Sequence, residues 1–257
     1  MTRAAVFAGP TLFQERSRPA GSITWLPPAG QGDLCRAVRA GFAVIGLVDG
    51  LFETGPAVQH KEILWAMSRG VHVLGAASMG ALRAAELAEY GMVGIGQIYL
   101  DFRLGRLERD DEVAVLHAPA ELGFRPLTEA MVDIRATLQR ALAAKIVSPG
   151  LAERMISTGE QMFFKDRRWE DLLAAAADRR RAASLARLRA WLPDNRVSLK
   201  RRDALEMVAA VGQLLKGNRS PHRPSFIFQR TADWNTLLKA ARRSSALGED
   251  GAAPGSR

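Results

Sequence analysis

Residues 71–86 read VHVLGAASMGALRAAE, and this stretch decides the fold. Its first four residues are apolar without helical periodicity, which is typical of a buried strand, and the apolar residues after Met79 recur at helical spacing. Ser78 therefore lies at a sharp strand-to-helix turn, with the small residues Ala76 and Gly80 two positions to either side. This is the layout of a nucleophile elbow, although Ala76 replaces the first glycine of the Gly-x-Ser-x-Gly motif. The alternative is that Ser78 only caps the helix, because serine is a preferred N-cap residue.

Strands and helices alternate on both sides of this stretch. Short apolar segments, each ended by Gly or Pro, predict buried strands at residues 4–9, 23–26, 43–48 and 71–74. Helical patterns follow them at residues 33–40, 57–69 and 79–90, and Pro56 is expected to open the second of these helices. Strand and helix in alternation predict a parallel sheet with right-handed crossovers. We therefore expect an α/β protein whose N-terminal core, residues 1–126, is a parallel sheet with crossover helices.

Beyond residue 126 the pattern predicts helices only. Apolar residues recur three and four positions apart over residues 128–144, 151–158, 169–192 and 198–215. We interpret residues 127–243 as an all-helical, Arg-rich C-terminal region and residues 244–257 as a disordered tail. The basic clusters at residues 179–181 and 200–202 are interpreted as solvated helix faces, with partner docking as the alternative.

Composition excludes several classes of protein. With 257 residues, 47% hydrophobic and 25% charged, the chain is globular and long enough for one large domain or two small ones. No apolar run reaches the roughly 18 residues of a membrane span, and the first nine residues are too short for a signal core. We therefore expect a cytoplasmic protein without membrane association. The single cysteine, Cys35, excludes an internal disulfide and a cysteine-cluster metal site, and we expect it to be buried.

The net charge of +9 is unevenly distributed. Residues 1–120 hold 11 Lys and Arg against 12 Asp and Glu, whereas residues 121–257 hold 25 against 15. A basic half attracts an acidic partner by long-range steering, and nucleic acid is one candidate. Because no nucleic-acid-binding motif accompanies the charge, we do not expect nucleic-acid binding.

A nucleophilic serine needs a base, and Lys61 is the candidate. In a helix over residues 57–69, its neighbours three and four positions away are all apolar: Ala57, Val58, Leu64 and Trp65. Such surroundings disfavour the charged amine and lower its pKa. The helix is expected to begin at the carboxyl edge of the strands, where Ser78 emerges and where α/β folds keep their sites. The alternative is that Lys61 reaches solvent or pairs with a carboxylate.

His60 competes for the same role. Together with Ser78 and Asp49, which follows the strand of residues 43–48, it would supply the residue types of a catalytic triad. Adjacent helical residues point about 100° apart, so His60 and Lys61 do not both face Ser78. We favour Lys61 as the base and assign His60 to turn structure or substrate contact.

The remaining polar signals are weaker. Arg83 and Glu86 lie three positions apart on the helix after Ser78, where they either pair with each other or meet an anionic substrate group. The acidic run of residues 110–112 has no matching cluster to complete a metal site, so we interpret it as a solvated turn. The glycines of residues 91–96 follow a helix rather than a strand and do not form a dinucleotide fingerprint. We therefore expect neither a metal nor a cofactor.

Several short strings, in order along the chain, resemble the core of the TfuA-like family over about residues 3–140. They are GPTL at 9–12, PP at 27–28 with GD at 32–33, VDGLF at 48–52, HKEIL at 60–64, ASMGALRAAE at 77–86 and DDEV at 110–113. The resemblance implies a role in peptide-backbone thioamidation beside a YcaO enzyme, which uses ATP to activate a backbone amide. It also implies hydrolysis of the C-terminal thiocarboxylate of a small ThiS-like sulfur carrier, which releases sulfide. The Ser-Lys pair associated with the family falls on Ser78 and Lys61.

The implied mechanism uses both residues. Neutral Lys61 takes the proton of Ser78, whose oxygen attacks the thioacid carbon, while backbone N–H groups around Met79 and Gly80 hold the oxyanion. Gly75 and Gly80 would let a thin diglycine tail approach the backbone. The alternative is a non-catalytic adapter that docks to the YcaO enzyme and raises its affinity for the peptide substrate, with Ser78 only capping its helix.

Overall fold

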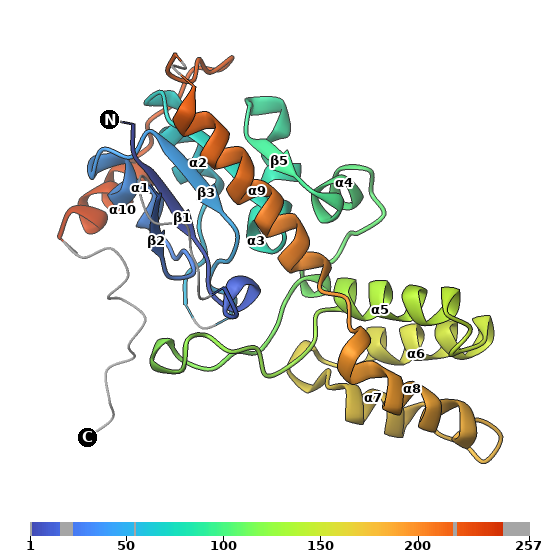
Figure 1. Ribbon diagram of the computed structural model, residues 1–257. Coiled ribbons are helices and arrows are strands. Elements are labelled where there is room, and N and C mark those ends of the chain that lie inside the picture. Colours follow the sequence, from blue (N-terminus) through green and yellow to red (C-terminus); the bar gives the residue numbers. More distant parts are fainter. Residues whose placement is uncertain (1, 16–22, 54, 218–219, 244–257) are drawn as a thin grey trace, which may run out of the picture.

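A computed structural model describes residues 2–15, 23–53, 55–217 and 220–243 (Figure 1). Within these ranges five short strands form one parallel sheet with the order β2-β1-β3-β4-β5. Their bounds are β1 Ala4–Phe7, β2 Ile23–Leu26, β3 Val44–Leu47, β4 His72–Ala76 and β5 Val93–Ile95. The α/β class and the first four strands are confirmed. β5 lies in the glycine-containing segment 91–96, where the sequence pattern does not identify a strand. The expected tail, residues 244–257, lies outside the described residues.

Helices accompany the sheet in two groups. Those interleaved with the strands are α1 Asp33–Arg39, α2 His60–Ser68, α3 Met79–Leu87 and α4 Gln97–Arg103. Those after the sheet are α5 Met131–Ala143, α6 Pro149–Gln161, α7 Trp169–Ala175, α8 Ala182–Asn195, α9 Leu199–Lys216 and α10 Ala232–Arg243. Short 3-10 turns are η1 Pro10–Leu12, η2 Ala88–Tyr90, η3 Asp110–Glu112, η4 Ala120–Leu122 and η5 Phe164–Asp166. In the part of the chain that the structure describes, no helix combines the length and the apolar composition needed to cross a membrane.

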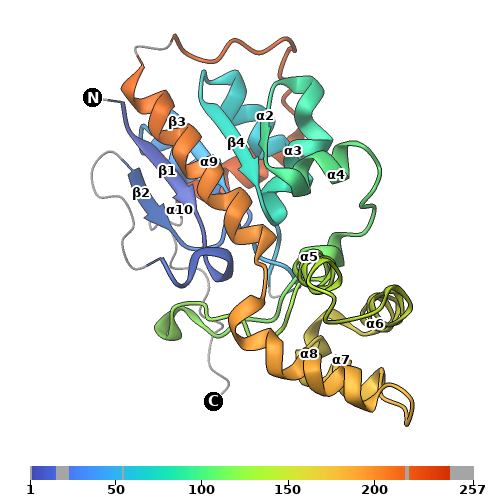
Figure 2. The same ribbon diagram turned by 45° about the vertical axis from the view of Figure 1, so that its right-hand side comes forward.

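Alternate residues of the strands face two helical layers. Phe7 and Ile45 point to one face, which packs against α1, α2 and part of α3. Val6 and Val44 point to the opposite face, which packs against α9. Figures 1 and 2 both show α9 running diagonally across that face. Because both faces are covered, the strands are largely apolar, with Thr24 and His72 as the polar exceptions, which explains their nearly continuous apolar runs.

The C-terminal helices do not form one unit. α5 to α8 share a core of their own, which includes Met131, Leu138 and Leu172, and we call them the helical subdomain. α9 instead covers the sheet, and α10 packs against α1 over the buried side chain of Cys35. The division expected at residue 126 is therefore corrected, because α9 and α10 return to the α/β core. The expected burial of Cys35 is confirmed.

Several helix boundaries differ from those predicted. α2 begins at His60 rather than after Pro56, and the N–H of its N-cap residue Gln59 donates to the Glu62 carboxylate. Such a reciprocal cap favours a helix start at that position. The helix expected over residues 169–192 is two helices, α7 and α8, and Pro193 lies inside α8 instead of ending it. The sequence pattern predicts neither α4 nor α10.

The start of α3 presses against the ends of β3 and β4, backbone to backbone. A Cβ atom on Gly80 would lie 1.7 Å from the carbonyl oxygen of Leu47. One on Gly75 would lie 2.1 Å from the Gly80 carbonyl oxygen. Only glycine fits at both positions. Gly75 and Gly80 therefore serve the packing of α3 on the sheet, and not the approach of a diglycine tail.

A buried carboxylate joins α1 to α2. Glu62 is fully buried and accepts hydrogen bonds from the backbone N–H groups of Gly32 and Gln59. Burial raises the pKa of Glu62 from 4.5 to about 7, although the two backbone hydrogen bonds oppose the shift. Cys35 lies beside this carboxylate, and burial raises the pKa of its thiol as well. Proton binding at Glu62 is therefore linked to folding.

We expect Gly80→Ala to lower the free energy of unfolding by about 3 kcal/mol or more, because the added methyl group overlaps a carbonyl that the sheet holds in place. The matched control is Gly212→Ala within α9, where an added Cβ meets no atom within 4 Å. That change should raise the free energy of unfolding by about 0.5–1 kcal/mol, since alanine restricts the unfolded backbone more than glycine. Denaturant unfolding measures both, and equal effects would contradict the packing of α3.

The folded protein binds the Glu62 proton more tightly than the unfolded chain. The stability that this proton contributes is fully present below pH 4.5 and is lost as the pH rises through about 7. The loss is on the order of 3 kcal/mol. Free energies of unfolding from about pH 4 to 8 should therefore fall relative to those of Glu62→Gln, which does not titrate. A difference between the two proteins that does not change with pH would refute the linkage.

Candidate active site

The candidate site lies at the carboxyl edge of the sheet. Ser78 follows β4, Asp49 follows β3, and Thr11 lies in η1, which follows β1. The strand order places the topological switch between β1 and β3, and open α/β folds bind ligands outside the strand ends at such a switch. The first turn of α9 closes the same edge, because Lys200 reaches the η3 segment there.

The turn that presents Ser78 is strained. The Ser78 N–H donates to the carbonyl oxygen of Ala76 over 2.8 Å, and Ala77 between them has a φ of 68°. A hydrogen bond two residues apart around a positive φ is a rare and strained γ-turn, a conformation found at functional sites. Ser78 occupies the N-cap position of α3, but its hydroxyl does not cap the helix. Instead the Ser78 Oγ donates to the carbonyl oxygen of Val113 over 3.4 Å.

A buried lysine reaches the same carbonyl. Lys200 is the second residue of α9 and only 3% exposed, and its Nζ donates to the Val113 oxygen over 2.6 Å. The Ser78 Oγ and the Lys200 Nζ therefore lie within about 6 Å of each other, the most that distances of 3.4 and 2.6 Å to a common atom allow. The interpretation of residues 200–202 as a solvated face is wrong for Lys200.

The surroundings of Lys200 favour a neutral amine. Burial lowers its pKa, and the nearby carboxylates of Asp49 and Asp133 oppose that shift. Asp133, on α5, also fixes the start of α9, because it accepts hydrogen bonds from the Lys200 N–H and the Ser198 hydroxyl, each over 3.1 Å. The helical subdomain thus positions the lysine. A neutral amine at this place can accept a proton.

Asp49 is buried and its oxygens are all engaged by the loop after β1. One oxygen accepts from the N–H groups of Gly9 at 2.8 Å and Thr11 at 3.1 Å, and the other accepts from the Thr11 hydroxyl at 2.6 Å. The carboxylate holds this loop and places a negative charge near Lys200. The structure does not bring it to His60, so the triad of Ser78, His60 and Asp49 is not formed.

Lys61 lies away from this cluster. Its Nζ donates to the Thr231 hydroxyl over 2.9 Å in an exposed position and lies 5.9 Å from the centre of the Phe228 ring. The expected desolvation of Lys61 beside Ser78 is thus corrected. The physical reason is its place in the first turn of α2, where its side chain meets the segment before α10 instead of the sheet edge.

His60, Arg83 and Glu86 form a partly exposed cluster between α2 and α3. The His60 Nε2 and the Arg83 Nη1 both contact the same Glu86 oxygen, at 2.6 and 2.7 Å. Burial raises the pKa of Glu86, but hydrogen bonds from His60 and Arg83 outweigh it, and the net pKa is lowered. Of the two interpretations of Arg83 and Glu86, their mutual pairing is the one observed. Arg83 and Glu86 also line a groove of about 710 Å³ beside Met79, which extends to residues 108–111.

The two backbone groups expected to hold an oxyanion differ in their hydrogen bonding. The Gly80 N–H donates to the Val48 carbonyl oxygen over 3.1 Å, so it is not available. The Met79 N–H has no acceptor among the residues that the structure describes. It is the first N–H of α3, where the helix dipole favours negative charge.

Arginines hold the acidic segment that leads into Val113. Arg167, fully buried, donates to the Asp111 carboxylate and to the Asp111 carbonyl oxygen. Arg135 donates to Glu112 over 3.0 Å. The solvated turn expected at residues 110–112 is therefore a paired one, and among the described residues no group of three His, Cys, Asp or Glu side chains could hold a metal ion. These pairs fix the carbonyl that Ser78 and Lys200 share.

Comparison with known proteins agrees with the resemblance in the sequence. Residues 49–168 match the family model of the TfuA-like proteins, which supports the assignment of the chain to this family. The family is associated with YcaO enzymes and with YcaO-dependent thioamidation, which connects the chain to that process. A comparison with the curated proteins finds no match.

We expect Thr11→Val to lower the free energy of unfolding by about 1–3 kcal/mol, because it leaves one oxygen of the buried Asp49 carboxylate without its donor. Thr11→Ser keeps the hydroxyl and should recover most of that loss. Denaturant unfolding of the two variants provides the measurement. Equal stability of the valine and serine variants would show that the hydroxyl does not matter.

Proposed function

We propose that this chain hydrolyses the C-terminal thiocarboxylate of a small ThiS-like sulfur carrier, with Ser78 as the nucleophile and Lys200, in place of Lys61, as the base. The observation that carries the proposal is the single carbonyl oxygen of Val113, which accepts a hydrogen bond from both side chains. Ser78 lies on a strained strand-to-helix turn, and Lys200 is a buried amine with a lowered pKa. The match of residues 49–168 to the TfuA-like family model supports the sulfur chemistry.

The first half-reaction acylates Ser78. Neutral Lys200 takes the hydroxyl proton and the Ser78 Oγ bonds to the thioacid carbon. The carbon–sulfur bond then breaks, and Lys200 gives the proton to the departing sulfur, which leaves as hydrosulfide and returns the amine to its neutral form. Hydrogen bonds of catalytic groups are often long before substrate binds. The Ser78 hydroxyl and the Lys200 amine, which lie within about 6 Å of each other, would come into hydrogen-bond contact when the carrier binds. Sulfide is a much better leaving group than an amine, so the reaction requires only modest stabilisation of the transition state.

The second half-reaction returns the free enzyme. Water gives a proton to Lys200 and attacks the acyl carbon, the ester bond breaks, and the Ser78 oxygen regains a proton. The Met79 N–H is the group of this chain that would hold the oxyanion in both halves. The groove beside Met79 provides a route for a slender peptide end, and Arg83 on its wall can meet an anionic group of the carrier.

An adapter role is the second candidate. The Lys200 amine is almost fully buried and already hydrogen-bonded, so the contacts of Val113 could serve only to tie the η3 segment to α9 and α3. In that case the chain would bind the YcaO enzyme and raise its affinity for the peptide without reacting with the carrier.

Sulfide release from a thiocarboxylated carrier, measured on the purified chain alone, separates the two functions. We expect Ser78→Ala and Lys200→Met each to lower the rate at least about a hundredfold, because each removes one partner of the proton transfer. The matched control is Lys61→Met, which removes a partly buried lysine that is hydrogen-bonded to Thr231, and it should leave the rate within about twofold. Loss of activity in Lys61→Met with normal activity in Lys200→Met would refute Lys200 as the base.

The pH dependence provides a check that does not rely on Lys200→Met folding normally. Since the base acts when neutral, the rate of the unmodified protein should rise with pH and level off below pH 10.5, the ordinary pKa of lysine. Absence of sulfide release by the unmodified chain at every pH would favour the adapter function.

A further inference from the structure

A segment far from the catalytic edge forms one wall of a second pocket. Residues 220–231, which we call the strap, form neither helix nor strand and lead past α2 to α10. The His222 N–H donates to the Gly70 carbonyl oxygen over 2.9 Å, and Phe226 packs on Tyr90 with ring centres 5.7 Å apart. Phe228 packs on Trp234 at 5.2 Å. These contacts hold the strap in place and leave a cavity between it, α1 and α2.

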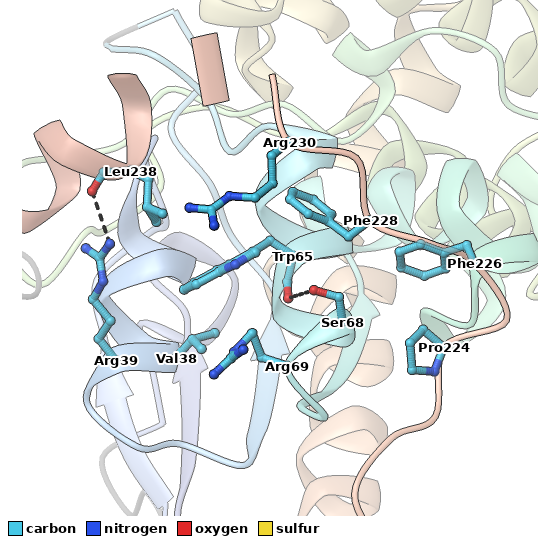
Figure 3. A pocket seen from close by; sticks show the side chains of 10 residues that line it. All are labelled: Val38, Arg39, Trp65, Ser68, Arg69, Pro224, Phe226, Phe228, Arg230 and Leu238. Carbon is cyan, nitrogen blue, oxygen red and sulfur yellow. Dashed lines mark hydrogen bonds between the residues drawn. The ribbon is translucent and has the colours of Figure 1, made fainter. Parts of the chain in front are cut away.

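This pocket has a volume of about 620 Å³, within the range of small-molecule sites. Figure 3 shows the side chains that line it, with the indole of Trp65 at the centre. They are Val38 and Arg39 of α1, Trp65 and Ser68 of α2, Arg69, the strap residues Pro224, Phe226, Phe228 and Arg230, and Leu238 of α10. No carboxylate is among them. We call this the arginine–tryptophan pocket.

Three arginines from different elements surround the Trp65 ring (Figure 3). Arg39 donates to the Leu238 carbonyl oxygen over 3.1 Å, and its guanidinium carbon lies 6.0 Å from the centre of the Trp65 ring. Arg69 and Arg230 make no ion pair with any residue in the described ranges. Arg69 and Arg230 carry like charges without a carboxylate partner among the described residues, and an anion near them would be attracted to both.

The chemistry of the pocket selects a ligand with two parts. A guanidinium fork matches phosphate oxygens in geometry, and such charge-assisted hydrogen bonds are strong. Trp65 and Phe228 line the pocket with aromatic rings, and a heterocyclic ring can stack on such a side chain. We infer that the arginine–tryptophan pocket binds a nucleoside phosphate, with its ring against the aromatic side chains and its phosphates between Arg69 and Arg230.

This site is separate from the proposed catalytic site. α2 begins near the carboxyl edge of the sheet and runs back, so Ser68 and Arg69 lie where the helix ends, towards the start of β4. The residues around the pocket include none of those that contact Val113. Binding of a nucleotide therefore does not depend on whether Ser78 and Lys200 are catalytic.

Calorimetric titration of the full chain with ADP, adenosine and pyrophosphate tests the inference. We expect saturable binding of ADP, and binding at least about tenfold weaker for adenosine, which lacks phosphate, and for pyrophosphate, which lacks the ring. No saturable ADP binding would overturn the inference. Equal affinity for ADP and pyrophosphate would also overturn it, because that result indicates a simple anion site. Displacement of ADP by a short polyglutamate peptide that binds more tightly would overturn it as well.

Variants locate the site. Arg69→Gln and Arg230→Gln should each weaken ADP binding about tenfold, because each removes a charged donor to phosphate. The matched control is Arg223→Gln, also an exposed arginine of the strap but not part of the pocket, which should leave the affinity unchanged. Ser78→Ala should bind ADP normally while it fails to release sulfide, so the two proposals fail separately. Equal ADP affinity in all three arginine variants would place any binding elsewhere.

Discussion

The hydrogen bond from the buried amine of Lys200 to the carbonyl oxygen of Val113 connects every part of the molecule that matters for the site. It joins the start of α9 to the η3 segment and, through the same oxygen, to the turn after β4. A buried amine is costly unless it is hydrogen-bonded. Burial lowers the pKa of Lys200, and the nearby carboxylates of Asp49, which follows β3, and Asp133, in the helical subdomain, oppose that shift. The α/β core and the helical subdomain thus meet where the nucleophile and the base are proposed to act.

The parts of the fold that the sequence predicts are those that local rules govern. The stretch around Ser78 is correctly identified as strand, turn and helix because apolar runs and helical periodicity change there within a few residues. β5 is not identified, since three residues among glycines carry no periodic signal. The packing of α9 on the sheet is not predicted either, because the apolar stripe of an amphipathic helix does not indicate which apolar surface it covers.

The candidate site shows the same division. The position of Ser78 can be predicted from the sequence of its own turn. The burial of a lysine depends on tertiary packing, which its neighbours along the helix do not indicate. Lys61 has apolar neighbours and is nevertheless only partly buried, while Lys200 lies in a basic run and is buried. One local feature of the sequence could have marked Lys200 as a candidate. It lies in the first turn of a helix capped by Ser198, where the helix dipole disfavours a positive charge. Such unfavourable local choices are expected at functional sites.

The position of α9 along the chain has a consequence for biosynthesis. One face of the sheet is complete by β5, yet the helix that covers the other face ends only at Lys216. During synthesis on the ribosome, strands that contain Val6 and Val44 are made more than a hundred residues before their cover, at a rate of about 5–20 residues per second. The apolar face of the nascent sheet is therefore exposed to solvent for several seconds. A chaperone that binds nascent chains would act in that interval. A premature stop codon before α9 would leave one apolar face of the sheet without its covering helix.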